Sequence, residues 1–167
     1  MLLRHGKAES PVATADIDRP LSNRGRGQSL LAGEALRERD LTPQRAVISP
    51  ALRTRETWDA CAIGLGASDE VRLLVEVDDR IYANTLDELL DVVNETGDDI
   101  EVLLLIGHNP SVAGLAGVLD EDGSGPAHRK LAEGFPTGAL AVFEFDVPWA
   151  QVRAGSATLK DLIRRQP

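Results

Sequence analysis

The sequence is poor in aromatic residues and cysteine, and it lacks any long apolar run. Phe, Trp and Tyr make up 4% of its 167 residues, and Cys61 is the single cysteine. One cysteine excludes an intramolecular disulfide and argues against a cysteine-built metal site, so we expect Cys61 to be a small buried hydrophobe on a helix. No apolar run approaches the roughly 18 residues of a membrane-spanning helix, and no basic-then-apolar leader opens the chain. These absences predict a soluble, cytoplasmic protein without a membrane partner.

Positive charge is also in deficit. The chain has 18 Lys and Arg against 27 Asp and Glu, which gives a formal net charge of -9. Because a nucleic-acid surface needs a basic patch, this balance predicts no nucleic-acid partner. A small anion can bind such a chain only where a few cations converge against the background field.

Hydrophobic residues make up 43% of the chain, and short aliphatic runs alternate with segments of helical periodicity. Strands are expected over residues 1–3, 46–50, 71–77, 101–106 and 138–145. Helices are expected over residues 22–39, 52–63, 85–95 and 111–119. Gly64 and Gly66 are expected to break the second helix, residues 120–127 to form a loop, and the tail after Trp149 to add an edge strand and a short helix.

This alternation of strands and helices predicts the α/β class in a single domain over residues 1–167. Right-handed crossovers would join a mainly parallel sheet with helices on both faces. The first strand is short, because three residues at about 3.3 Å each span only about 10 Å. Either this strand is clipped or the natural chain starts upstream of Met1.

The residues that follow the predicted strands carry the chemistry. In such sheets, ligands bind beyond the carboxyl ends of the strands. Arg4, His5 and Gly6 follow the first strand, Arg53 lies in the first turn of the helix after the second, and His108 follows the strand over 101–106. Two of the three histidines and two arginines are therefore expected to converge at one edge of the sheet.

These residue types suit phosphoryl transfer. A neutral imidazole nitrogen can attack phosphorus and form a covalent phosphohistidine that water later hydrolyses. The planar guanidinium donors of Arg4 and Arg53 match phosphate oxygens, and Gly6 would let the backbone approach the phosphate closely. The pattern favours a phosphatase, and by itself it leaves both His5 and His108 open as the nucleophile.

Several blocks resemble the histidine phosphatase superfamily, which is phosphoglycerate mutase-like. Within it, the chain is most similar to the short phosphohistidine phosphatases of the SixA type. The blocks are Leu-Arg-His-Gly-Lys-Ala at 3–8, Asp-Arg-Pro-Leu-Ser-Asn-Arg-Gly at 18–25, Ser-Pro-Ala-Leu-Arg-Thr-Arg-Glu-Thr at 49–57, Ile-Gly-His-Asn-Pro at 106–110 and Phe-Pro-Thr-Gly-Ala at 135–139. The resemblance implies that His5 is the nucleophile and that Arg4, Arg53 and His108 complete the phosphate pocket. It also implies a three-layer α/β/α sandwich that needs no metal or cofactor.

The segment 76–82 departs from the superfamily pattern. Members of the phosphoglycerate mutase type carry a glutamate in this region that protonates the leaving oxygen, in a context that this segment lacks. Asp18, Glu76 and Asp78 are the candidate acids. A phosphohistidine leaves as imidazole, whose conjugate acid has a pKa of about 6.5, so it needs protonation less than an alkoxide does.

The expected substrate is therefore a phosphohistidine protein or a small phosphomonoester with a good leaving group. Two alternatives stay open. One is a small-metabolite phosphatase or mutase of the same fold, and the other is a catalytically inert phosphate-binding module.

Overall fold

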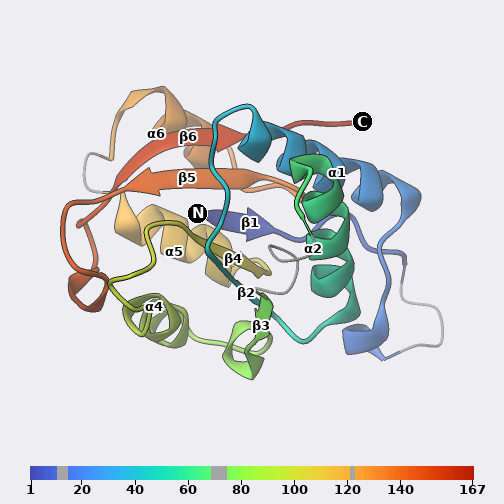
Figure 1. Ribbon diagram of the computed structural model, residues 1–167, viewed down its shortest axis with the longest axis horizontal. Helices are drawn as coiled ribbons and strands as arrows, with labels where there is room; N and C mark the ends of the chain where they lie inside the picture. Colours follow the sequence, from blue (N-terminus) through green and yellow to red (C-terminus); the bar gives the residue numbers. More distant parts are fainter. Residues whose placement is uncertain (11–14, 69–74, 121–122) are drawn as a thin grey trace.

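The computed structural model describes residues 1–10, 15–68, 75–120 and 123–167. Within these residues a six-stranded sheet has the strand order β3-β2-β4-β1-β5-β6 (Figure 1). The strands are β1 (Leu2–Arg4), β2 (Arg45–Ile48), β3 (Val75–Val77), β4 (Leu103–Gly107), β5 (Leu140–Glu144) and β6 (Thr158–Ile163). The α-helices are α1 (Asn23–Arg37), α2 (Leu52–Leu65), α4 (Leu86–Asn94), α5 (Ser111–Leu119) and α6 (Gly125–Ala132). None of the helices in these ranges is both long and apolar enough to cross a bilayer.

The sheet is mainly parallel, as predicted. The first four strands in this order, β3, β2, β4 and β1, are parallel to one another. β5 pairs antiparallel with β1, and β6 pairs antiparallel with β5. The tail supplies the edge strand β6, and a short 3-10 helix covers Trp149–Gln151. β1, β2 and β4 are neighbours, so their carboxyl ends meet at the same edge.

Helices cover both faces of the sheet and make the expected three-layer α/β/α sandwich. Under α1 and α2 lies one cluster of buried side chains, which includes Leu3, Leu36, Ile48, Trp58 and Ile106. Under α4 and α5 lies a second cluster, which includes Leu2, Leu89, Leu105, Val112 and Leu115. Cys61 belongs to the first cluster with no exposed surface, and burial raises the pKa of its thiol to about 12. It is a packed hydrophobe, as expected.

The prediction that Gly64 breaks the second helix is wrong. α2 continues through Gly64 to Leu65 and ends at Gly66, whose φ of 72° is left-handed. A Cβ on Gly64 would lie 2.0 Å from the carbonyl oxygen of Leu30 in α1. A Cβ on Gly33 of α1 would lie 1.9 Å from the carbonyl oxygen of Cys61. These glycines therefore serve the close approach of the two helices, a tertiary need that the local pattern does not show.

Two other boundaries differ from expectation. α6 begins at Gly125, inside the predicted loop over 120–127, with Pro126 in its first turn, where a missing N–H is tolerated. The strand expected over 71–77 is seen as β3, and its first part, residues 71–74, lies outside the described residues. Ser22 caps α1, because its side chain accepts a hydrogen bond from the Gly25 amide.

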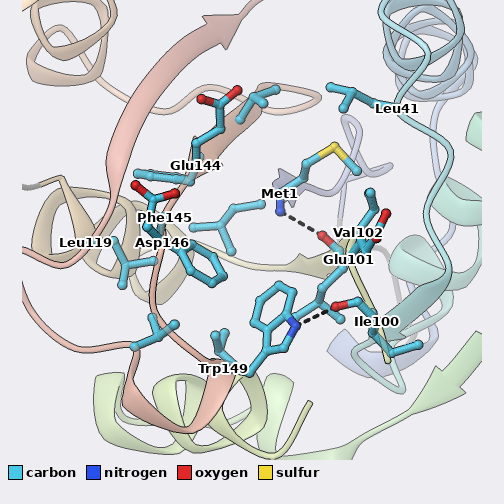
Figure 2. A pocket seen from close by; sticks show the side chains of 16 residues that line it. Met1, Leu41, Ile100, Glu101, Val102, Leu119, Glu144, Phe145, Asp146 and Trp149 are labelled. Carbon is cyan, nitrogen blue, oxygen red and sulfur yellow. Dashed lines mark hydrogen bonds between the residues drawn. The ribbon is translucent and has the colours of Figure 1, made fainter. Parts of the chain in front are cut away.

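A cavity of about 450 Å³ lies at the amino end of β1, the end away from Arg4 (Figure 2). Leu2 pairs with Leu105 of β4 and with Ala141 of β5, so both of these strands extend beyond Met1. Residues of both strands line the cavity. The Met1 ammonium donates to the Leu103 carbonyl at 2.7 Å, and burial lowers its pKa to about 5. This cavity is therefore separate from the residues that follow the carboxyl ends of the strands.

Candidate active site

The structure brings the predicted residues together at the carboxyl edge of the sheet. His5 directly follows β1, His108 directly follows β4, and Arg53 lies in the first turn of α2 after β2. The imidazole centroids of His5 and His108 are 5.0 Å apart, and Arg53 Nε lies 3.3 Å from His108 Nδ1. His5, Arg53 and His108 are separated by 48 and 55 residues along the chain and thus form one cluster of imidazoles and a guanidinium.

The backbone fixes which nitrogen of His5 is free. His5 Nδ1 lies 2.7 Å from the Gly6 carbonyl oxygen. A carbonyl can only accept, so Nδ1 carries the hydrogen and Nε2 carries the lone pair. Burial, with the nearby Arg53 and Arg4 charges, lowers the pKa of His5 to about 4. At neutral pH His5 is therefore an uncharged imidazole with Nε2 available as a nucleophile.

His108 holds the opposite tautomer. Arg53 can only donate, so His108 Nδ1 accepts its Nε–H, and Nε2 carries the hydrogen that points to Ser49 Oγ at 2.8 Å. Ser49 is fully buried at the end of β2. Burial, followed by the influence of His5 and Arg53, lowers the pKa of His108 to about 3. Both imidazoles are thus neutral and oriented before any anion enters.

Arg4 lies beside Asn109 and shares an acceptor with it. Arg4 Nη1 and Asn109 Nδ2 donate to the Phe135 carbonyl oxygen at 2.8 Å and 2.9 Å. Among the described residues, Arg4 Nε and Asn109 Oδ1 are buried side-chain atoms without a hydrogen-bond partner. Such atoms are costly unless a ligand or water satisfies them, and an anionic oxygen would suit the Arg4 Nε–H.

Gly6 lets the turn after β1 pack closely against the start of α1. A Cβ on Gly6 would lie 2.4 Å from the Gly25 carbonyl oxygen, so the missing side chain makes room for the start of α1. The Gly6 amide donates to Thr57 Oγ1 of α2 at 3.1 Å, and the Lys7 carbonyl accepts from the Ser22 amide at 2.8 Å. The turn that carries His5 is therefore tied to both α1 and α2.

Asp16 is a site residue that the sequence interpretation missed. It begins a 3-10 helix, Asp16–Asp18, and its carbonyl oxygen and Oδ2 accept from Arg53 Nη1 at 2.6 Å and Nη2 at 2.9 Å. Tyr82 and Arg19 also donate to its carboxylate, at 2.9 Å and 2.8 Å. These partners, Arg19 first, hold the pKa of Asp16 far below its usual range. The Asp-Ile-Asp run offered both Asp16 and Asp18, and no spacing rule distinguishes which one turns inward.

Two of the three acid candidates pair with arginines outside the cluster, and the third is exposed. Asp18 is exposed, Glu76 accepts from Arg45 at 2.8 Å, and Asp78 accepts from Arg80 at 2.7 Å. Neither Glu76 nor Asp78 is paired with one of the clustered histidines or arginines. In the described part of the chain, no group of three or more His, Cys, Asp or Glu side chains is arranged to hold a metal ion.

The two imidazoles give a pH prediction. His5 and His108 should stay uncharged at pH 6, where an unperturbed histidine of pKa 6.5 is largely protonated, and should protonate only near pH 4 and 3. The unfolded chain takes up these protons first, so the free energy of unfolding should fall as the pH drops from about 6.5 toward 4. Ring-proton NMR titration, with peaks assigned from His5→Gln and His108→Gln variants, measures both values. Titration of either ring near 6.5 would contradict the described environment.

Comparisons with known proteins agree with this geometry. The sequence profile described as histidine phosphatase superfamily (branch 1) matches residues 1–84. Over 159 residues the chain is 32% identical to an uncharacterized protein of Mycobacterium tuberculosis, which covers 94% of this chain and 96% of that protein.

Solved structures are similar over nearly the whole chain. A proposed phosphohistidine phosphatase SixA from Nakamurella multipartitia superposes with a TM-score of 0.81 and 29% identity, over 98% of this chain and 94% of that one. A proposed SixA from Agrobacterium tumefaciens gives a TM-score of 0.79 and 24% identity, over 98% and 96%. The second likeness, at that identity, concerns the fold alone.

Proposed function

Because this chain belongs to the histidine phosphatase superfamily, we propose that His5 is the nucleophile of a phosphatase whose covalent intermediate is a phosphohistidine. The observation that carries the proposal is the state of the His5 imidazole. The ring is neutral, its Nε2 has a free lone pair, and its centroid lies 5.0 Å from that of the His108 ring. Arg4, Arg53 and His108 surround it as the rest of the phosphate pocket.

The reaction proceeds in two displacements. The Nε2 lone pair of His5 attacks phosphorus, and the bond to the leaving group breaks with its electron pair going to that group. Water then attacks the phosphorus of phospho-His5 and loses a proton, which yields inorganic phosphate and restores the neutral imidazole. Arg4 and Arg53 stabilise the charge on the phosphoryl oxygens, and the unpartnered Arg4 Nε–H gains an acceptor. No step requires a metal ion.

The leaving group decides the substrate class. Glu76 and Asp78 pair with arginines away from the cluster, and Asp16 is held ionised, so none is set to donate a proton. A group that departs as imidazole needs this proton least, because its conjugate acid has a pKa of about 6.5. We therefore favour phosphohistidine protein as the substrate, ahead of phosphomonoesters with poor leaving groups.

A substrate comparison tests the proposal. We expect the metal-free protein to hydrolyse a histidine-phosphorylated protein and p-nitrophenyl phosphate, with kcat/KM at least about tenfold above that for sugar phosphates or phosphoglycerates. Faster turnover of a small metabolite would instead favour the metabolite phosphatase or mutase. If phosphate raises the Tm while no substrate is consumed, the chain is a phosphate-binding module and the proposal is wrong.

A further inference from the structure

The guanidinium of Arg53 has two distinct donor edges in this structure. Its outer end, formed by Nη1 and Nη2, is occupied by the Asp16 carbonyl oxygen and Oδ2. Its inner edge, formed by Nε and the second Nη2 hydrogen, faces His108, whose Nδ1 accepts from Nε at 3.3 Å. A planar guanidinium keeps these two edges in a fixed relation, so whatever holds the outer end also aims the inner one.

Asp16 is itself anchored by two further side chains, Arg19 and Tyr82. Arg19 Nη1 donates to Oδ1 at 2.8 Å, and Arg19 is bound in turn to the Glu9 carbonyl oxygen through Nε and Nη2, at 3.1 Å and 2.8 Å. The Tyr82 hydroxyl donates to Oδ2 at 2.9 Å, and the Tyr82 ring stands edge-on to His108 with centroids 5.7 Å apart. The Asp16 carboxylate is about half exposed, whereas the Arg53 side chain is 7% exposed. The anchored carboxylate thus caps a nearly buried cation.

We propose that Asp16 is a positioning residue that clamps the outer end of Arg53 and thereby presents the inner Nε/Nη2 edge to the phosphoryl group. This role rests on the proposed function. A phosphoryl oxygen would replace His108 Nδ1 as the acceptor on the inner edge, and Asp16 would keep its place on the outer end. The clamp fixes the guanidinium before substrate arrives, so less side-chain freedom is lost on binding.

Charge alone predicts the opposite effect, and this makes the proposal testable. Removing the Asp16 carboxylate leaves the pocket more positive, which by electrostatics should tighten binding of a phosphate dianion. If the Asp16 carboxylate merely occupied the phosphate position, its removal would also tighten phosphate binding, because it would no longer compete with the phosphate. Loss of a clamp should instead weaken phosphoryl binding and slow the reaction, because the freed guanidinium samples other orientations.

The experiment compares Asp16→Ala and Asp16→Asn with the control Asp91→Asn, which removes one exposed carboxylate on α4. We expect Asp16→Ala to lower kcat/KM for p-nitrophenyl phosphate about 10- to 100-fold and to weaken inorganic phosphate binding, measured by calorimetry. Asp16→Asn keeps an acceptor oxygen and should lose less, and Asp91→Asn should match wild type.

A double-mutant cycle separates positioning from a general structural effect. In an Arg53→Ala background, assayed at high enzyme concentration, Asp16→Ala should have little further effect, because the residue acts through Arg53. An undiminished loss in that background, or tighter phosphate binding and faster turnover in Asp16→Ala alone, would overturn the proposal. If wild type consumes no substrate, the proposed function fails by itself, and the calorimetric comparison of phosphate binding still decides the role of Asp16.

Discussion

Replacing His5 with alanine is expected to lower kcat by about 10⁴-fold or more, because the variant loses the atom that forms the covalent intermediate. His5 is the imidazole whose Nδ1 is committed to the Gly6 carbonyl, and its Nε2 is the free lone pair. His108 directs its only lone pair, on Nδ1, at the Arg53 guanidinium and its Nε2–H at Ser49, whereas the lone pair of His5 has no such partner. The loss should therefore be close to complete.

Phosphoenzyme trapping gives the direct measurement. Wild type quenched with a ³²P-labelled substrate should carry an acid-labile, alkali-stable label, which is the behaviour of a phosphoramidate, and His5→Ala should carry none. His108→Ala is the matched comparison and should still be labelled, at a lower rate. A label that survives in His5→Ala and disappears in His108→Ala would assign the nucleophile to His108. Circular dichroism and Tm of each variant confirm that the fold is intact.

Arg53→Ala is expected to lower kcat/KM by about 10³-fold, since a buried guanidinium that stabilises phosphoryl charge is worth this much in comparable sites. Arg53 also donates to His108 and to Asp16, so its removal frees both of these side chains. Lysine should not restore activity, because a single ammonium cannot reach His108, Asp16 and a phosphoryl oxygen in one plane.

Arg55→Ala is the matched control for this experiment. Arg55 lies on the same first turn of α2 and is exposed, whereas Arg53 is buried. Steady-state kinetics with p-nitrophenyl phosphate should show wild-type activity for Arg55→Ala. Equal losses in the two variants, or recovery in Arg53→Lys, would mean that net charge near α2 matters rather than the geometry of one guanidinium.

The sequence could predict that the site residues lie close together, because their proximity follows from the sheet topology. Aliphatic runs end at Arg4, before His108 and before Ser49, and parallel strands place those ends at one edge. The assignment of His5 rather than His108 as nucleophile came only from family resemblance. The structure adds a physical reason for it, since the two imidazoles carry their hydrogens on different nitrogens.

The features that could not be predicted depend on contacts between distant segments. Asp16 reaches Arg53 across 37 positions of the chain, and nothing local distinguishes it from Asp18. Gly64 is read as a helix breaker from its own propensity, but contact with Leu30 makes a glycine necessary within α2. Gly6 lies in close contact with Gly25, and its position after the first strand does not reveal this contact.

The cavity beside Met1 has a practical consequence for handling the protein (Figure 2). Residues fused in front of Met1, such as an affinity tag, would begin between β4 and β5 instead of in solvent, because Leu103 and Phe143 flank that path. A tag there would change the hydrogen bonds between β4, β1 and β5. It would also replace the buried Met1 ammonium, which donates to the Leu103 carbonyl, by an amide. The exposed carboxyl end at Pro167 is therefore the better place for a tag whenever stability is to be compared between variants.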